Sequence, residues 1–215
     1  TFSLGVTLGN FVVGVPLDAN FEAKAEFLSH LNVYSVVIGF TALFLFSLHG
    51  CLFLMMKTED HFHERLRLWA MRLGAGFVFM FILATQMTWI SHPYMMEISK
   101  GHEKELVAIT MLNTALIMGI FHFIYNNRPR IAFSLSCMLM AFLILVYTIG
   151  TYPVLLRSSI DPDNNSLTIF NATASPLTLK ILLLIVVIGA PFAVLYTLHT
   201  YRTFRGKVNK DNLVY

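Results

Sequence analysis

Charged residues are scarce in this chain. Only 13% of its 215 residues are Asp, Glu, Lys or Arg, and 56% are hydrophobic. An average soluble domain carries about 25% charged residues. A water-soluble globule needs polar side chains over its surface, and this chain has too few of them. Intrinsic disorder is also excluded, because it requires low hydrophobicity and high charge. The composition therefore predicts a membrane protein.

Cysteine is nearly absent as well. Cys51 and Cys137 both lie in apolar runs, so they predict neither a disulfide framework nor a zinc site, and we interpret them as small packing residues. The short motifs of phosphate, dinucleotide, c-type haem and zinc-protease sites are missing. The net charge of +3 comes from basic residues beside apolar segments, which argues against nucleic-acid binding.

What the chain does contain is long apolar runs. A helix needs about 20 apolar residues to cross a bilayer, because the hydrocarbon core is about 30 Å thick and each residue rises about 1.5 Å. Five stretches reach or approach this length. They are residues 31–56, 66–90, 106–125, 131–156 and 177–201. The sequence therefore predicts an all-α, polytopic integral membrane helix bundle with five full transmembrane helices, forming one membrane domain over 1–215.

Residues 1–14 are also apolar, but they are too few to span a bilayer. They lack the basic start of a signal peptide. We expect them to be the end of a truncated helix, and the chain to be part of a longer protein.

The few charges predict an orientation. Basic residues concentrate on the cytoplasmic side of membrane proteins. Segments 57–72, 126–130 and 202–215 together hold ten Lys and Arg, whereas the alternate segments hold five. We therefore expect a cytoplasmic C-terminal tail over 202–215. The loops expected to face outward are 15–30, 91–105 and 157–176.

Two features inside the spans bear on packing and chemistry. Gly74 and Gly76, with Ala75 between them, predict a close approach between the second full helix and its neighbours. None of the five stretches contains Asp or Glu. A proton relay built on intramembrane carboxylates is therefore not expected within them.

Histidines are the candidate chemical groups. His49 lies inside the first full span, where imidazole can ligate haem iron, relay protons or pair with a neighbouring helix. We favour the structural pairing and keep a proton-relay or quinone-side role and haem ligation as alternatives. His122 and His199 lie near helix ends, where polar groups are favourable, although the three could converge. His61 and His63 fit a solvated loop better than a metal site. No catalytic or metal-binding residue is predicted.

Several motifs resemble subunit II of the cytochrome bd quinol oxidases. They are GNFVVGVP at 9–16, LNVY at 31–34, HG at 49–50, KTE at 57–59, YP at 152–153, SS at 158–159, SLTI at 166–169, NATASPLTL at 171–179 and FRGKV at 204–208. The resemblance runs over the whole chain but covers only the later part of that family's subunit.

The resemblance implies a role. Such oxidases oxidise membrane quinol, reduce O2 to water and generate a proton gradient. In the family, haem b, haem d and the quinol site belong to subunit I, which subunit II stabilises. The resemblance thus implies a non-catalytic subunit in the bacterial plasma (inner) membrane with no cofactor of its own. Its implied partners are the haem-bearing subunit I, membrane lipid and quinone, with a small single-helix subunit as a further candidate.

Two other functions remain open at this stage. A fragment of a secondary transporter would be expected to show internal repeats and paired broken helices around a midplane site. A haem-binding membrane protein in its own right would use His49 with a methionine or a second histidine. Haem retention by the isolated chain separates these alternatives.

Overall fold

The computed structural model describes residues 1–20, 22, 31–95 and 103–203. Its elements, in chain order, are α1 (Phe2–Val13), α2 (Val33–Lys57), α3 (Asp60–Ser91), α5 (Glu103–Tyr125), α6 (Pro129–Thr151), β1 (Val154–Leu156), β2 (Leu167–Thr168) and α7 (Pro176–Thr203). The last five helices are long and apolar enough to cross a membrane. This confirms the prediction of an all-α, polytopic membrane bundle. Most of the predicted tail, 204–215, lies outside the described residues.

Local sequence explains where several helices begin and end. Asn32 caps α2, because its side-chain oxygen accepts a hydrogen bond from the backbone N–H of Ser35 at 2.8 Å. Pro129 is the first residue of α6, where its missing N–H costs nothing. Asn127 adopts a φ of 55°, a left-handed conformation that asparagine tolerates, and closes the tight turn between α5 and α6.

Two predicted boundaries were wrong. The span predicted over 131–156 ends as a helix at Thr151, because Pro153 cannot continue it and disfavours helical backbone at the preceding residue. Residues Val154–Leu156 instead form β1, which pairs antiparallel with β2. The helix predicted over 66–90 begins earlier, at Asp60, so that most of the basic segment 57–72 is helical rather than a loop.

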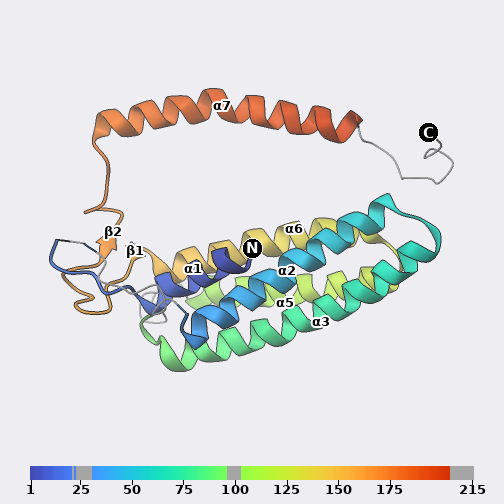
Figure 1. Cartoon of the computed structure of the whole chain (residues 1–215), viewed down its shortest axis with the longest axis horizontal. Helices are drawn as coiled ribbons and strands as arrows, with labels where there is room; N and C mark the ends of the chain where they lie inside the picture. The colour runs from blue at the N-terminus through green and yellow to red at the C-terminus, as the bar shows by residue number, and fades with distance from the viewer. Residues whose placement is uncertain (21, 23–30, 96–102, 204–215) are drawn as a thin grey trace.

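The bundle is built around α2. This helix packs against α1, α3 and α6, while α5 packs against both α3 and α6. Four helices, α2, α3, α5 and α6, therefore form a ring, with α1 beside α2 (Figure 1). We call the end with the α2–α3 and α5–α6 turns the turn end. The opposite end, with residues 14–18 and 152–175, is the loop end.

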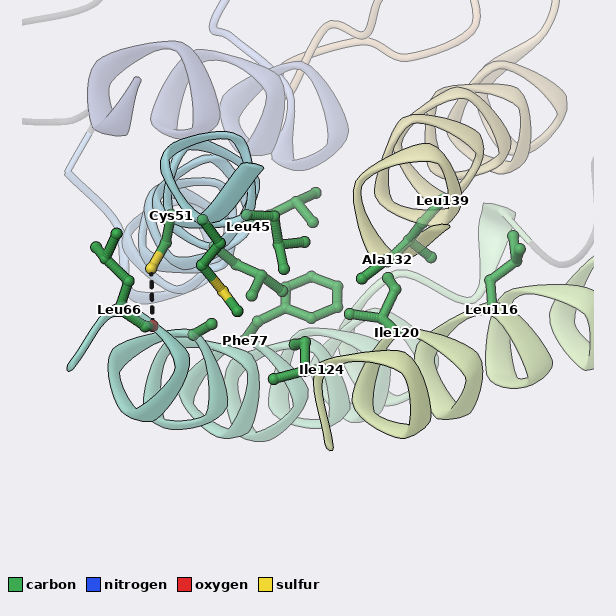
Figure 2. Close-up of a cluster of buried hydrophobic side chains, with 13 residues drawn as sticks. Leu45, Cys51, Leu66, Phe77, Leu116, Ile120, Ile124, Ala132 and Leu139 are labelled. Atoms are coloured by element: carbon green, nitrogen blue, oxygen red, sulfur yellow. Dashed lines mark hydrogen bonds between the residues drawn. The ribbon is translucent and has the colours of Figure 1, made fainter. Parts of the chain in front are cut away.

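Apolar side chains from all four ring helices meet inside it. Phe77 of α3 is only 1% exposed and reaches the middle of the cluster in Figure 2. Side chains of α2, α5 and α6, including Leu45, Ile120 and Leu139, surround it. In lipid, close packing of this kind replaces the hydrophobic effect as the force that holds helices together.

Glycines permit the closest contacts of α3. A Cβ atom on Gly74 would lie 2.8 Å from Phe121 Cζ of α5. A Cβ atom on Gly76 would lie 2.7 Å from Phe44 Cε1 of α2. Both distances are shorter than van der Waals contact, so the small-residue patch serves helix packing, as predicted.

Helix α7 lies apart from the bundle (Figure 1). No residue is buried along its described length, Pro176–Thr203. Near its C-terminal end, the Tyr201 ring lies 6.3 Å from the Phe53 ring of α2, an edge contact. The helix is therefore tethered at the loop end and touches the bundle close to its other end, leaving its apolar surface uncovered between them.

Candidate functional site

His49 is held between two helices. Its Nδ1 atom lies 2.8 Å from Ser136 Oγ of α6, and its ring stacks on Phe133 with centroids 4.4 Å apart. The Ser136 hydroxyl donates its single proton to the Phe133 carbonyl oxygen at 2.7 Å. Because that proton is committed, the imidazole Nδ1–H must donate to Ser136. His49 thus ties α2 to α6.

The two bundle histidines differ in which ring nitrogens are engaged. An axial haem ligand needs a free nitrogen lone pair and room for the macrocycle. His49 donates through Nδ1, which leaves the lone pair on Nε2, and has one ring face covered by Phe133. His63 lines an open cavity of about 750 Å³ at the turn end, but its Nδ1 and Nε2 atoms face the Met55 carbonyl oxygen at 3.0 Å and Asn127 Oδ1 at 2.6 Å. Neither His63 nitrogen is free for iron.

The other histidines are not brought together with His49. His122 forms a hydrogen bond with Asn126 at the end of its own helix, and His199 is exposed on α7. His61 is exposed, whereas the neighbouring His63 joins the α2–α3 and α5–α6 turns. Among the residues described, no three His, Cys, Asp or Glu side chains gather as a metal site.

A polar and aromatic cluster lies at the loop end. The Tyr34 hydroxyl lies 2.8 Å from Thr88 Oγ1, and the Tyr34 ring meets the His92 ring edge-on at 4.6 Å. The Arg157 guanidinium stacks over the Tyr94 ring at 3.8 Å, close enough for a strong cation–π contact. The Tyr94 hydroxyl donates to the Val12 carbonyl oxygen at 2.5 Å. The cluster joins α1, α2 and α3 to the segment after α6.

The surroundings of this cluster favour neutral side chains. Burial, with a smaller contribution from the Arg157 charge, lowers the pKa of His92. Burial raises the pKa of Tyr94 to about 12, although Arg157 opposes that change. Tyr94 therefore stays a hydrogen-bond donor at physiological pH, and His92 resists protonation.

Ser158 organises the loop that follows β1. Its hydroxyl donates to the Leu17 carbonyl oxygen at 3.2 Å and accepts from the backbone N–H groups of Ile160 and Asp161, each at 3.3 Å. Its own N–H donates to Ser166 Oγ at 3.0 Å. The Val15 N–H and the Arg157 carbonyl oxygen form a hydrogen bond of 2.9 Å. Residues 14–18 and 157–166 therefore form one hydrogen-bonded unit.

Asn171 fixes the second half of the loop. Its Oδ1 accepts from the Thr168 N–H at 2.7 Å, and its Nδ2 donates to the Ser166 carbonyl oxygen at 2.9 Å. Ser158, Ser166, Thr168 and Asn171 all belong to the motifs that resemble the oxidase family. These motifs build a folded cap over the loop end. Their polar side chains form hydrogen bonds with backbone groups of the cap.

Sequence reasoning missed the roles of Arg157, Tyr94 and Ser158. The motif resemblance pointed to the serines without saying what they hold. Arg157 and Tyr94 belong to different connecting segments, and no periodic pattern relates them. The prediction that no residue of this chain is catalytic stays a prediction.

Comparison with known proteins agrees with the motifs. The family described as cytochrome bd terminal oxidase subunit II matches residues 1–204. Cytochrome bd-I ubiquinol oxidase subunit 2 of Escherichia coli strain K12 is 24% identical over 241 residues, covering 98% of this chain and 63% of that protein. Cytochrome bd ubiquinol oxidase subunit 2 of Bacillus subtilis strain 168 is 25% identical over 215 residues, covering 100% and 62%. The chain thus spans less than two thirds of these relatives' length.

The family match includes the bundle, the cap at the loop end and α7. It rests on nearly the whole chain rather than on an isolated motif. The chain belongs to the cytochrome bd terminal oxidase subunit II family.

Proposed function

We propose that this chain is a non-catalytic membrane subunit of a respiratory quinol oxidase in the bacterial plasma membrane. The complex would oxidise quinol, reduce O2 to water and generate a proton gradient. Its haem b, haem d and quinol site would belong to a partner, subunit I. Family membership supports this proposal, and the two relatives are named as ubiquinol oxidase subunits.

The exposed apolar surface of α7 is the observation that best supports the proposal. This helix is apolar around its whole circumference and uncovered along its described length. Membrane helices associate through close packing and hydrogen bonds, and α7 makes few such contacts with its own bundle. Its surface is therefore available to a partner chain, and we assign it to the interface with subunit I.

The contacts of the ionisable groups support a structural role for this chain. His49 and His63 are engaged in hydrogen bonds between helices and turns, and Arg157 is stacked on Tyr94. Each of these groups therefore has a packing function that requires no redox chemistry. This leaves the haems to the partner in our proposal.

We also propose that the turn end and the C-terminus face the cytoplasm. The contact between His63 and Asn127 holds the basic segments 57–72 and 126–130 at the same end of the bundle. Basic segments favour the cytoplasmic side. The loop end, with its folded cap, would then face outward. A small single-helix subunit and bound quinone would be further components.

Site-specific cross-linking tests the interface. A photoreactive amino acid is placed at Leu183 of α7 or at Phe79 of α3, two apolar positions that are each 64% exposed. We expect illumination of the native membrane to join the Leu183 variant to a haem-bearing protein. The Phe79 variant should give only lipid adducts. Lipid adducts alone from both positions would contradict the proposed interface.

A further inference from the structure

The only two tryptophans of the chain mark a membrane-sized interval on α3. Trp69 is 53% exposed and Trp89 is 64% exposed. They are 20 residues apart, which corresponds to about 30 Å along a helix, the thickness of the hydrocarbon core. Tryptophan concentrates at the two membrane interfaces. The hydrocarbon layer therefore crosses α3 between these residues.

This placement puts the first turns of α3 in the headgroup layer. Residues 60–68 precede Trp69 and extend beyond the hydrocarbon boundary at the turn end. Tyr125, the last residue of α5 at the same end, is 73% exposed and suits the same interface. The basic residues of this part of α3 therefore lie at the depth of lipid phosphates.

One face of α3 combines two arginines with Trp69 at this depth. Arg65, Trp69 and Arg72 are spaced four and three residues apart, so they follow one stripe of the helix, and all three are exposed. The Arg72 guanidinium lies over the Trp69 ring, 5.7 Å from its centroid. Helical side chains point toward the N-terminus, so Arg72 extends back from the hydrocarbon to the interface.

The positive charges of Arg65 and Arg72 are not neutralised by an acidic side chain of the described residues. Arg67, on another face of the same helix, pairs with Glu64 at 3.3 Å. Within the part of the chain that the structure describes, neither Arg65 nor Arg72 has an acidic partner. The same stripe continues to Phe79, an exposed apolar side chain two turns deeper than Arg72. The stripe is therefore charged at the membrane interface and apolar deeper in the hydrocarbon layer. A phospholipid has the same order, with a charged headgroup followed by apolar acyl chains.

We propose that Arg65, Trp69 and Arg72 bind the headgroup of an anionic phospholipid, with its acyl chain along Phe79. The two arginines lie about 10 Å apart along the axis and bracket the indole. Guanidinium groups bind phosphate oxygens with paired hydrogen bonds, and the indole N–H adds a further donor. A zwitterionic lipid would bring a cation to a stripe that already carries two positive charges. This inference does not rest on the proposed oxidase role.

Lipid titration of the purified, delipidated complex tests the site. The variants are R65Q/R72Q and the matched control R67Q, which removes a charge already paired with Glu64. Bound phosphatidylglycerol is counted by native mass spectrometry, and the thermal unfolding midpoint is followed during the titration. We expect the double variant to bind one phosphatidylglycerol about thirtyfold more weakly than wild type, on the scale that two basic residues contribute at an anionic surface. R67Q should bind like wild type.

Several results would overturn the proposal. They are equal binding by wild type and R65Q/R72Q, an equal loss in R67Q, the same stabilisation by phosphatidylcholine, or its reproduction by inorganic phosphate alone. No binding by wild type would show that a partner chain covers the stripe, which also overturns it. If the double variant fails to assemble, single variants R65Q and R72Q should each bind about fivefold more weakly. The cross-linking at Leu183 reports on subunit pairing separately.

Discussion

At the scale of single residues, a substitution of His49 tests whether this side chain packs α2 against α6 or binds a cofactor. We expect His49→Ala to leave the haem content of the purified complex unchanged and to lower its thermal unfolding midpoint. A double-mutant cycle with Ser136→Ala should give a coupling of about 0.6 kcal/mol, typical of hydrogen bonds between membrane helices. The reduced-minus-oxidised spectrum measures the haem, and a selective loss of one haem signal in H49A would contradict the packing role.

Gly9 illustrates a residue whose size is dictated by a neighbouring helix. A Cβ atom there would lie 2.6 Å from the Ser35 Cα of α2, which is backbone and cannot yield without moving the helix. We expect Gly9→Ala to destabilise the protein by about 1–3 kcal/mol, the usual cost of overpacking. Thermal unfolding of the purified complex measures the change.

Gly50 provides the control for that substitution. It also lies in a helix, but apart from the adjoining backbone of α2 nothing lies within 4 Å of the position its Cβ would take. Gly50→Ala should be neutral or slightly stabilising, because alanine favours helix more than glycine does. Equal destabilisation by the two substitutions would contradict the assignment of the loss at Gly9 to the α1–α2 contact.

His92 predicts a pH dependence of stability. An unperturbed histidine has a pKa near 6.5, and burial together with Arg157 lowers the pKa of His92 in the folded protein. The unfolded chain therefore binds this proton more readily, and stability is lost as the pH falls from about 6.5 through the lower folded pKa. His92→Gln should lose less stability than wild type between about pH 7.5 and about pH 5. If wild type and His92→Gln lost the same stability over this pH range, this assignment would be refuted.

At the scale of elements, length and apolar character were enough to predict the five spanning helices. Asn32 and Pro129 are also recognisable start signals, because a cap and a proline at the first turn act locally. The end of α6 was predicted too late, since the apolar residues of Val154–Leu156 continue the pattern after the helix has stopped. Hydrophobicity alone does not distinguish a helix from a strand in so short a run.

The cap at the loop end was the least predictable element. Ser158 reaches Leu17, and Tyr94 reaches Val12, across large separations in the sequence. Such hydrogen bonds leave no periodic trace, because they depend on how the helices are already arranged. The candidate site was therefore predicted only as a conspicuous motif, without its contacts.

Ser158 gives a prediction about this cap. Ser158→Ala removes the hydroxyl that donates to the Leu17 carbonyl oxygen and accepts from the N–H groups of Ile160 and Asp161. Because buried backbone groups lose their partners, we expect faster hydrogen exchange in residues 14–18 and 157–166. Ser159→Ala is the matched control, since Ser159 is exposed and its hydrogen bond to the Val15 carbonyl oxygen uses only its backbone N–H. Equal exchange in both variants would show that Ser158 does not hold the cap.

At the scale of the whole molecule, two exposed surfaces are not covered by the described part of the chain itself. The uncovered length of α7 suits a partner helix bundle, and the arginine–tryptophan stripe of α3 suits lipid. Helix α7 is not part of the packed ring of α2, α3, α5 and α6, and the stripe consists of exposed side chains of α3. In our proposal these two surfaces are covered by the partner chain and by lipid, and the chain supports the partner without catalysing the reaction itself.

The most direct test of this account is the distribution of haem between separated subunits. The complex is purified through a tag on this chain, its reduced-minus-oxidised spectrum is recorded, and the subunits are then separated in a mild denaturing detergent. We expect the complex to show haem b and haem d signals, all of which leave with the partner while this chain retains none. Haem that stays with this chain after the partner has been removed would contradict the account.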